Sequence, residues 1–402
     1  MVKRRLLKWM TCCAALLPGG LPICGWADAS RVALPGSGTG GGDTSDAAGP
    51  AVERLVRAAA VYDEQGMRES VMRLTRIGAE CLPHLRPLFR HEDANVRWQS
   101  LITVGRIGAV DRSFLEPLIA ATADKDADVR GEAVTVLAQL FPSSSQVLMV
   151  VLALECDDHP VVRVRAFAAD WRLRKRRAAV AALVGLLGDR DWMAVQSAGR
   201  YLVCIGTPAI PELLQVMHKA DLRRRTIAVR ILGQLPDVPP VVVHSLAESA
   251  RSNNRGLSAA ATDALAHSGR RGWLVLERLA QSSQGALRAQ AVRSAAFLTT
   301  PYPELLPLLN SGLRDHDPRV RLAAMATMRR LRIGDERSVR RLCQLLQDRL
   351  PDHRAAAVAA LGGLGANARP ALSQLRAMSR DDPVDYIRRH ALKILDQVAD
   401  NR

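Results

Sequence analysis

Few residues in this chain have both the type and the spacing that metal or acid–base chemistry requires. An iron centre for oxygen chemistry needs several histidine and carboxylate ligands that converge on one point, and the sequence offers one such dyad, His91-Glu92. The other histidines near segment junctions occupy different positions and would point in different directions: His159, His316 and His353. No Cys and His residues share a helix face at a spacing that suits zinc. The residues therefore predict no metal site and no bound cofactor.

Catalytic motifs are equally scarce. The sequence holds no phosphate-cradling glycine loop, no nucleophile elbow and no paired carboxylates. The run Gly362-Gly363-Leu364-Gly365 is typical of a helix end. We predict that the protein is not an enzyme.

Basic residues are in clear excess. The chain carries 56 Lys and Arg against 40 Asp and Glu, a formal net charge of +16, so its surface should attract anions. The basic residues cluster at Arg172–Arg177, Arg223–Arg225, Arg270-Arg271, Arg329–Arg332 and Arg337–Arg341. What these clusters do depends on the helix faces that carry them.

The chain is built from a repeat, whose signature is the stretch Asp315–Ala326. With Val320 as the reference position, matching positions follow one another at steps of 29 to 34 residues. They are Val96, Val129, Val162, Val195, Arg224, Leu257, Leu287, Val320, His353 and Ile387. Such a period, with helical signals inside each unit, indicates a solenoid in which stacked repeats share one continuous core.

Each repeat contains one helix with a narrow apolar face. The residue four positions after the reference is Ala, Ser or Gly in every repeat, and the residue eight positions after it is usually aliphatic. Because these positions share a helical face, this second helix should pack closely against its neighbours as the inner helix of a pair. The first helix of each pair is predicted upstream, at residues 114–123, 146–155, 178–187, 210–218, 241–250, 273–280, 304–313, 338–347 and 371–378.

The aspartate, the Val-Arg pair, the small residue and the closing Leu-Gly resemble the HEAT-repeat family in its short bacterial form. The resemblance covers about Val52–Val398 and includes a degenerate unit at Gly66–Gly78, which brings the count to eleven helical pairs. It implies an all-α fold, a right-handed α-solenoid of about eleven helical hairpins. The inner helices of such a solenoid line a concave surface that the family uses mostly to hold partners, and a few relatives are enzymes.

The enzymes with this kind of repeat do not fit the residues. HEAT-like deoxyhypusine hydroxylases hold two irons on several His-Glu dyads, and this chain has one. HEAT-like alkylpurine DNA glycosylases use a basic track with an aromatic residue and an acid, a set that Trp98, Glu132 and Arg165 could imitate, but export makes this substrate improbable. Phycobilin lyases also resemble short HEAT repeats, and no residue set here carries their activity.

One subset of the arginines has a structural interpretation. An Arg directly follows the reference position in eight repeats: Arg97, Arg130, Arg163, Arg225, Arg288, Arg321, Arg354 and Arg388. Aspartates lie in the preceding turns, such as Asp93, Asp126, Asp158, Asp221 and Asp317. The resemblance implies that these residues form an ion-pair ladder between repeats.

The inner-helix positions that point away from the neighbouring helices should form the concave surface, and we predict that they bind the partner. The predicted binding residues are Trp98, Gln99, Arg106, Glu132, Gln139, Arg165, Arg172, Arg230, Gln290 and Arg293. The same positions elsewhere hold Tyr201, Gln234, Arg330, Arg389, His390, Lys393 and Gln397. Trp98 is the sharpest candidate because a partly exposed aromatic side chain can anchor a partner. The alternative is that Trp98 packs on the neighbouring helix.

One repeat departs from the apolar pattern. Asp170 occupies a core position, and we expect Trp171 to turn inward in its place. We interpret this departure as a local irregularity of the packing.

The N-terminal segment Met1–Ala29 has the pattern of a secretory signal peptide: basic residues, an apolar run from Trp9 to Leu17, and Ala27-Asp28-Ala29 before Ser30. Residues 30–50 have the composition of a flexible linker, and residues 51–402 would form the solenoid. The apolar run is too short for a spanning helix, and no other part of the chain offers one.

Two variants of this export signal stay open. Leu21-Pro22-Ile23-Cys24 resembles a lipoprotein box, although Ile23 stands where a small residue is expected, so Cys24 is a candidate for lipidation. The other variant is a twin-arginine signal around Arg4-Arg5.

Export would place four further cysteines in an oxidising compartment: Cys81, Cys156, Cys204 and Cys343. They lie in separate repeats without the paired spacing of a metal site or redox motif. We expect buried thiols that act as small apolar side chains.

Taken together, the residues predict an exported, non-enzymatic scaffold, periplasmic or in the cell envelope, that binds a partner protein or peptide on a basic concave face. The partner should be acidic. The alternative is a binder of polyanions, meaning nucleic acid or an anionic envelope polymer, in which backbone charges dominate the affinity.

Overall fold

The computed structural model describes residues 45–400. These residues form helices and no strands, and they divide into unit 1, up to Glu212, and unit 2, from Leu213. No helix in this range is long and apolar enough to cross a membrane. The predicted signal peptide, with its candidate Cys24, and residues 30–44 of the predicted linker lie outside the described residues.

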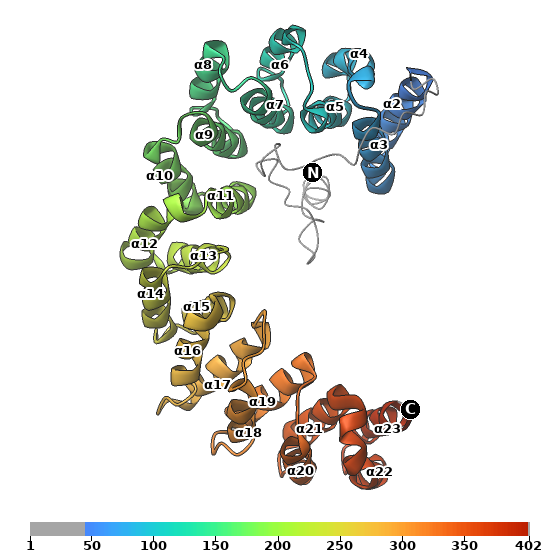
Figure 1. The fold of residues 1–402 in the computed structure, drawn as a ribbon, viewed down its shortest axis with the longest axis vertical. Helices are drawn as coiled ribbons and strands as arrows, with labels where there is room; N and C mark the ends of the chain where they lie inside the picture. The colour runs from blue at the N-terminus through green and yellow to red at the C-terminus, as the bar shows by residue number, and fades with distance from the viewer. Residues whose placement is uncertain (1–44, 401–402) are drawn as a thin grey trace. The chain divides into compact units, whose positions relative to one another are not determined.

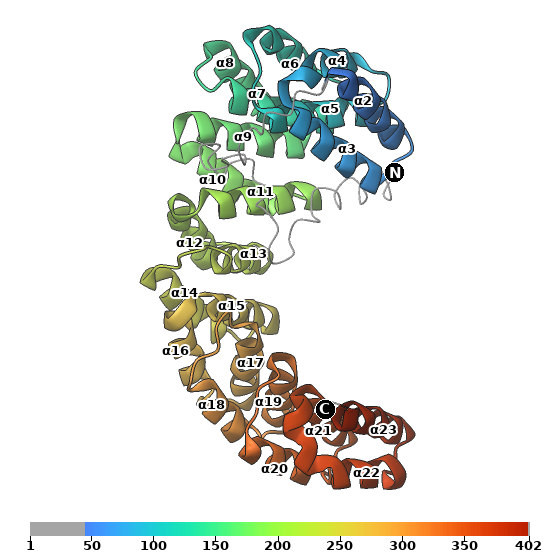
Figure 2. The same ribbon diagram turned by 45° about the vertical axis from the view of Figure 1, so that its right-hand side comes forward.

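Unit 1 stacks five helix pairs, with the inner helices side by side in Figures 1 and 2. The inner helices are α3 (Glu64–Ile77), α5 (Ala94–Ile107), α7 (Ala127–Leu140), α9 (Pro160–Arg174) and α11 (Trp192–Ile205). Their preceding partners are α2 (Ser45–Ala60), α4 (Leu82–Leu85), α6 (Leu115–Ala121), α8 (Ser145–Leu154) and α10 (Arg177–Gly185). Short 3₁₀ turns extend some of the outer helices at Gly78–Cys81, Arg86–Arg90, Arg112–Phe114 and Leu186–Gly188.

Unit 2 contains six pairs, counting α12 (Ile210–Lys219), which begins just before the boundary at Glu212. The inner helices are α13 (Leu222–Gly233), α15 (Arg255–His267), α17 (Gly285–Ser294), α19 (Pro318–Leu331), α21 (Pro351–Leu364) and α23 (Asp385–Asp400). The remaining outer helices are α14 (Pro240–Ala250), α16 (Gly269–Leu279), α18 (Leu305–Gly312), α20 (Glu336–Leu345) and α22 (Leu372–Asp381). 3₁₀ turns lie at Thr207–Ala209, Ala295–Phe297 and Gly365–Ala371.

This arrangement confirms the predicted all-α solenoid of eleven helical hairpins. One boundary differs, because α2 begins at Ser45, inside the predicted linker of residues 30–50. Ala48 and Ala51 are 0% and 1% exposed, so this alanine-rich stretch packs into the core of unit 1 as a helix.

Aspartate side chains start most of the inner helices. Asp93 accepts a hydrogen bond from the backbone N–H of Asn95 at 2.7 Å, which satisfies a donor that the helix itself leaves unpaired. Asp126, Asp191, Asp221 and Asp317 cap their helices in the same way. The aspartate that recurs in the repeat signature is therefore a helix cap.

The predicted arginine ladder is present, but its acids are different aspartates. Arg97 Nε lies 2.6 Å from Asp124 Oδ2, and Arg97 Nη1 donates to the carbonyl oxygens of His91 and Glu92 at 2.7 and 2.9 Å. The acid thus belongs to the next repeat and lies two residues before its helix cap. Five more pairs repeat this contact: Arg130–Asp157, Arg163–Asp189, Arg288–Asp315, Arg321–Asp348 and Arg354–Asp382.

The small residues predicted at the inner-helix contact are buried. Ala133, Ala166, Ala261 and Ala324 are each 0% exposed. A side chain no larger than a methyl group lets neighbouring inner helices approach closely, and the larger aliphatic residues on either side fill the seam.

The irregular repeat packs as expected for Trp171, which is 9% exposed. Asp170 stays in the core at 2% exposed and forms an ion pair with Arg174, one turn along the same helix. The acid in the core position is thus held by a local arginine.

The expectation of buried thiols is correct for Cys81 and wrong for two other cysteines. Cys156 and Cys204 are exposed, and Cys343 is half-buried. Cys81, Cys156 and Cys343 are free thiols. Cys156 lies after the end of α8 and Cys204 near the end of α11.

Candidate functional site

The inner-helix face of unit 1 brings three of the singled-out residues together. Arg165 of α9 forms an ion pair with Glu132 of α7. Gly131 makes this possible, because a Cβ atom there would lie 2.6 Å from Arg165 Cδ. Tyr201 of α11 lies close to this pair: burial raises the pKa of its phenol, Arg165 lowers it and Glu132 raises it. The charge of Arg165 is therefore balanced within the chain by the carboxylate of Glu132.

Trp98 is not a partner anchor. It is 5% exposed and belongs to the apolar cluster that contains Leu74 and Leu101. Helix α5 packs against both α2 and α3. The equivalent position is also buried at Gly131, Val164 and Ala289, so it faces a neighbouring helix rather than solvent. The same packing leaves Gln99 only 5% exposed, and we remove both residues from the predicted surface.

Of the other predicted residues, some have side chains that form hydrogen bonds within the chain, and others have exposed side chains. Gln139 Nε2 donates to the carbonyl oxygen of Gly105 at 2.7 Å, and Gln290 Nε2 contacts Thr262 Oγ1 at 3.2 Å. Arg293 donates to Gln290 Oε1 at 3.3 Å while remaining exposed. Arg172 is half-buried, and burial lowers the pKa of its guanidinium. Arg106 and Arg230 are exposed.

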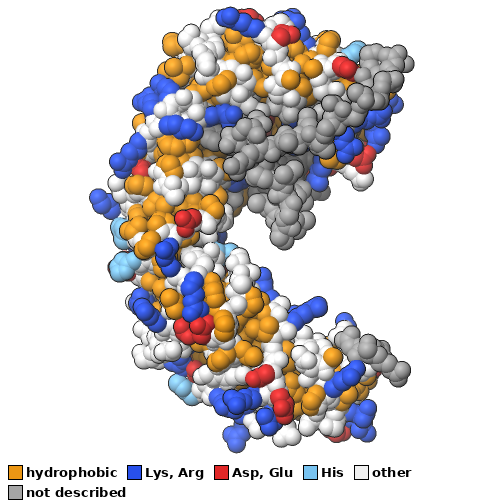
Figure 3. Space-filling model, viewed as in Figure 1, with side chains coloured by type: hydrophobic (Ala, Val, Ile, Leu, Met, Phe, Trp, Pro, Cys, Tyr) orange, Lys and Arg blue, Asp and Glu red, His pale blue; other side chains and the backbone are white. Residues whose placement is uncertain are grey.

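Basic side chains are spread over both units rather than gathered in one patch, as the blue atoms of Figure 3 show. The charge alone therefore marks no site. A site requires cations that converge on one cavity.

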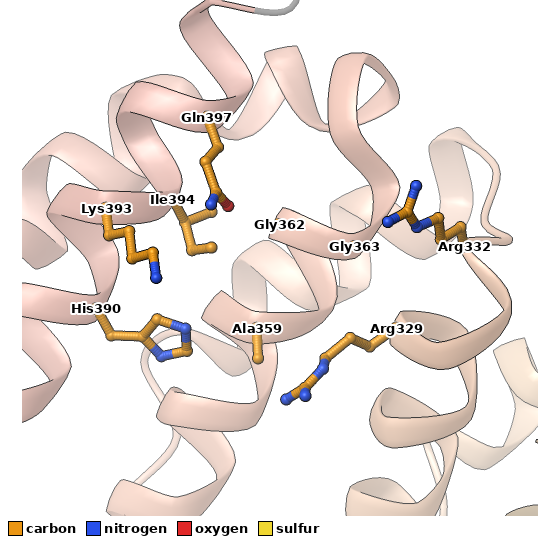
Figure 4. Close-up of a pocket in the computed structure, with 9 residues that line it drawn as sticks. All are labelled: Arg329, Arg332, Ala359, Gly362, Gly363, His390, Lys393, Ile394 and Gln397. Carbon is orange, nitrogen blue, oxygen red and sulfur yellow. The ribbon is translucent and has the colours of Figure 1, made fainter. Parts of the chain in front are cut away.

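Such a cavity lies on the inner-helix face of unit 2, between α19, α21 and α23 (Figure 4). Its volume is about 330 Å³. Its lining contains cationic and apolar residues and no Asp or Glu: Arg329, Arg332, Ala359, Gly362, Gly363, His390, Lys393, Ile394 and Gln397. We call it the α19–α23 pocket.

Two glycines form the floor of this pocket. A Cβ atom on Gly363 would lie 2.9 Å from the Cα and carbonyl oxygen of Arg329, and one on Gly362 would lie 2.5 Å from Ile394 Cδ1. The glycines thus let α21 pack against both neighbours and leave the floor without side chains. The helix end predicted for this run falls at Gly365, whose φ of 56° ends α21.

The cations around the floor are unpaired. Within residues 45–400, Arg329, Arg332 and Lys393 form no ion pair, whereas the ladder arginines each hold an aspartate. Figure 4 shows His390 and Lys393 reaching from α23, and Arg329 from α19, toward Ala359. Burial lowers the pKa of His390, and Arg329 and Lys393 lower it further.

The sequence pointed to parts of this pocket without joining them. His390, Lys393 and Gln397 were expected on the concave surface, and Arg329–Arg332 is one of the basic clusters. The missed signal is the glycine pair on the helix between them. Arg330 does not belong to the pocket, because its guanidinium stacks 4.4 Å from the ring centroid of Phe297.

Metal ligands do not converge in the described part of the chain: no three His, Cys, Asp or Glu side chains within residues 45–400 could hold an ion. His91 is engaged locally, since its Nδ1 accepts from the backbone N–H of Asp93 at 3.1 Å.

A family model described as HEAT repeats matches residues 52–138, 274–348 and 329–396, which together exceed half of the chain. No curated protein matches the sequence.

Solved structures share the fold at low identity. The karyopherin Kap121p bound to the extreme C-terminus of the protein phosphatase Cdc14p is 14% identical, with a TM-score of 0.52, and the match covers 89% of this chain and 46% of that one. Kap121p bound to Ste12p is 15% identical, with a TM-score of 0.51 and coverages of 89% and 45%. This chain therefore spans less than half the length of Kap121p. Together with the helix pairs and the arginine ladder, these matches show that the chain belongs to the HEAT-repeat family and folds as its α-solenoid.

Proposed function

We propose that the chain is an exported, non-enzymatic scaffold that binds an acidic segment of a partner protein on its inner-helix face. The observation that carries this proposal is the α19–α23 pocket, whose lining contains Arg329, Arg332 and Lys393 and no Asp or Glu. Unpaired cations on a rigid face favour a ligand that supplies the missing negative charge.

Two further observations support a protein as the ligand. In the similar Kap121p structures, the karyopherin is bound to Cdc14p and to Ste12p. The basic side chains also do not form one continuous track in Figure 3, as an extended nucleic-acid backbone would favour. Export rests on the Met1–Ala29 pattern.

The test compares three forms of the chain from Ser30 onward. The pocket variant carries Arg329→Gln, Arg332→Gln and Lys393→Gln. The control variant loses the same charge at Arg255, Arg278 and Arg337, which are exposed in unit 2 and lie outside the pocket. Each form is immobilised, exposed to the envelope fraction of the source cell, and washed at low and at high salt before mass spectrometry.

We expect the wild type and the control variant to retain one acidic protein at high salt, and the pocket variant to lose it. Recovery of only nucleic acid or anionic polymer, lost at high salt from all three forms, would contradict the proposal. That result would favour the polyanion alternative, because such binding falls linearly with salt on a log–log plot.

A further inference from the structure

The cations of the α19–α23 pocket lack ion-pair partners, whereas six ladder arginines each hold an aspartate of the next repeat. Arg97, Arg288 and Arg354 each meet an aspartate of the next repeat at 2.6 to 2.8 Å. At the pocket, acids are absent from the lining altogether. Like charges that face one cavity repel each other, and this cost is removed when an anion enters.

The shape of the pocket restricts what that anion is. A volume of about 330 Å³ lies at the small end of ligand pockets, which suits one side chain rather than a folded domain. The floor consists of Gly362, Gly363 and Ala359, so α21 contributes no side chain larger than a methyl group to the lining. Guanidinium groups on the α19 side match the oxygens of a carboxylate or phosphate in pairs, and Lys393 adds a point charge from α23.

We infer that the α19–α23 pocket binds a single oxyanion carried on a side chain of the partner, a carboxylate or a phosphate ester, with Arg329, Arg332 and Lys393 as its charged contacts. That a partner protein carries the anion rests on the proposed function. That the pocket binds an oxyanion does not. His390 is the fourth polar group, and its ring lies within reach of the same space in Figure 4.

Binding should also take up a proton. The charged groups that face His390 are Arg329 from α19 and Lys393 from α23, and α21 contributes no titratable group to the lining. In the empty pocket burial lowers the pKa of His390, and these two cations lower it further. A bound anion reverses the local charge and favours the imidazolium, so affinity rises as the pH falls through the ordinary range of histidine.

The experiment follows the His390 ring signal by NMR in histidine-labelled protein, with His390→Gln to assign it. The probes are inorganic phosphate and three peptides of one sequence that carry glutamate, phosphoserine or serine at the centre. We expect a saturable shift with phosphate and with at least one charged peptide, in the wild type and in the control variant, and no response to the serine peptide.

The pocket variant should bind each probe about tenfold more weakly or worse, since a charge-assisted hydrogen bond contributes roughly that factor. A second variant, Ala359→Glu, keeps every cation and places a carboxylate on the floor. It should fold and block binding by pairing with Arg329 and Lys393. The stronger of the two charged peptides identifies the oxyanion.

Three results would overturn the inference. One is an unchanged His390 response in the pocket variant together with a lower melting temperature, which would mean that the cations only neutralise the carbonyl ends of α19 and α21. Another is a shift with phosphate and with neither peptide, which would exclude a side chain as carrier. The third is the absence of any saturable shift in the wild type.

These results are distinct from a failure of the proposed function. If the pocket variant retains the envelope partner as well as the wild type does, the oxyanion inference fails and the scaffold stands. If the pocket binds phosphate and charged peptide but no partner protein is retained, the scaffold proposal fails and the pocket chemistry stands.

Discussion

Arg97 is almost fully buried and still carries a full charge. Its side chain is 6% exposed and that of Asp124 is 11% exposed. The guanidinium donates four hydrogen bonds of 2.9 Å or less, two to the Asp124 carboxylate and two to the carbonyl oxygens of His91 and Glu92. Burial raises the pKa of Asp124, but the hydrogen bonds from Arg97 and from the backbone N–H of Asp126 outweigh burial and lower it overall. Each partner therefore depends on the other.

Asp124→Asn should cost about 3 kcal/mol of unfolding free energy, because it leaves a buried guanidinium without its counter-charge. Urea unfolding followed by circular dichroism measures the loss. The matched comparison is Glu304→Gln, which breaks the exposed Arg270–Glu304 pair, and this change should be much smaller. Equal losses of unfolding free energy in the two variants would show that burial does not determine how much these ion pairs contribute to stability.

Glu155 is a half-buried residue whose carboxyl pKa is raised, in contrast to that of Asp124. Burial raises its pKa and nearby Asp170 raises it further, against the effects of Arg174 and Arg176. Within the described residues its Oε1 atom is buried without a hydrogen-bond partner. The fold thus binds the Glu155 proton more tightly than the unfolded chain does, and the ionised form lowers stability as the pH rises through the folded pKa.

Glu155→Gln should accordingly raise the urea midpoint at pH 7, and the gain should vanish as the pH falls below the ordinary pKa of glutamate. Urea midpoints of this variant and of the wild type, measured across this pH range, test the prediction. Glu92→Gln, at an exposed position, provides the control and should shift little. A midpoint that drops at pH 7 would mean that the ionised Glu155 stabilises unit 1.

Single residues of the binding surface were harder to predict than the repeat. Trp98 lies two positions after its reference residue, where we expected an exposed side chain, but it is 5% exposed, and Val164 and Ala289 at the same position are also buried. The period shows which residues recur and not how far neighbouring helices cover each face. The ladder acids were assigned to the wrong turn for a related reason, since an arginine reaches forward to Asp124 rather than to its own cap, Asp93.

At the scale of the helix, the spacing of small residues was enough to predict which face packs. Ala324 is 0% exposed on α19, and Ala326 on the same helix is exposed. The helix pairs and their order follow directly from this pattern, because close approach of inner helices requires a small side chain at one fixed position.

Ala324→Leu should therefore destabilise unit 2 by about 2 kcal/mol through overpacking. Ala326→Leu adds the same atoms at an exposed position and should change the free energy of unfolding by less than about 0.5 kcal/mol. Urea unfolding of both variants checks the contrast. If Ala324→Leu is tolerated equally well, the inner helices are not packed at this contact.

The α19–α23 pocket shows where helix-level prediction stops. Its residues come from three successive repeats, and their convergence depends on Gly362 and Gly363 between them. When each repeat is considered alone, these glycines indicate only the end of a helix. Aligning each inner helix with the next would have placed the cations on both sides of a bare stretch of α21.

For the whole molecule, the central prediction is export. Removing Met1–Ala29 takes away four basic residues and one acidic residue, so the mature chain would keep a net charge of +13. We expect protein purified from the source cell's envelope fraction to begin at Ser30 by intact mass and N-terminal sequencing. A lipid-modified N-terminus at Cys24 would select the lipoprotein variant, and an uncleaved Met1 in the cytosol would contradict export.

The arginine ladder is incomplete in one part of unit 2. Arg225 of α13 has no ion pair within the described residues, and Ser252 stands where the acid of the next repeat is expected. The following inner helix, α15, carries Ser258 in place of the arginine, whereas α17, α19 and α21 each hold an aspartate of the next repeat.

In mechanical terms, unit 2 therefore has a weak end and a strong end. In a repeat protein each joint is held mainly by its nearest neighbours, so a pulling force should open the α13–α15 and α15–α17 joints before the others. The three joints from α17 to α23 would yield last. The α19–α23 pocket lies on this stronger part, so a partner held there could transmit tension while the earlier repeats stretch.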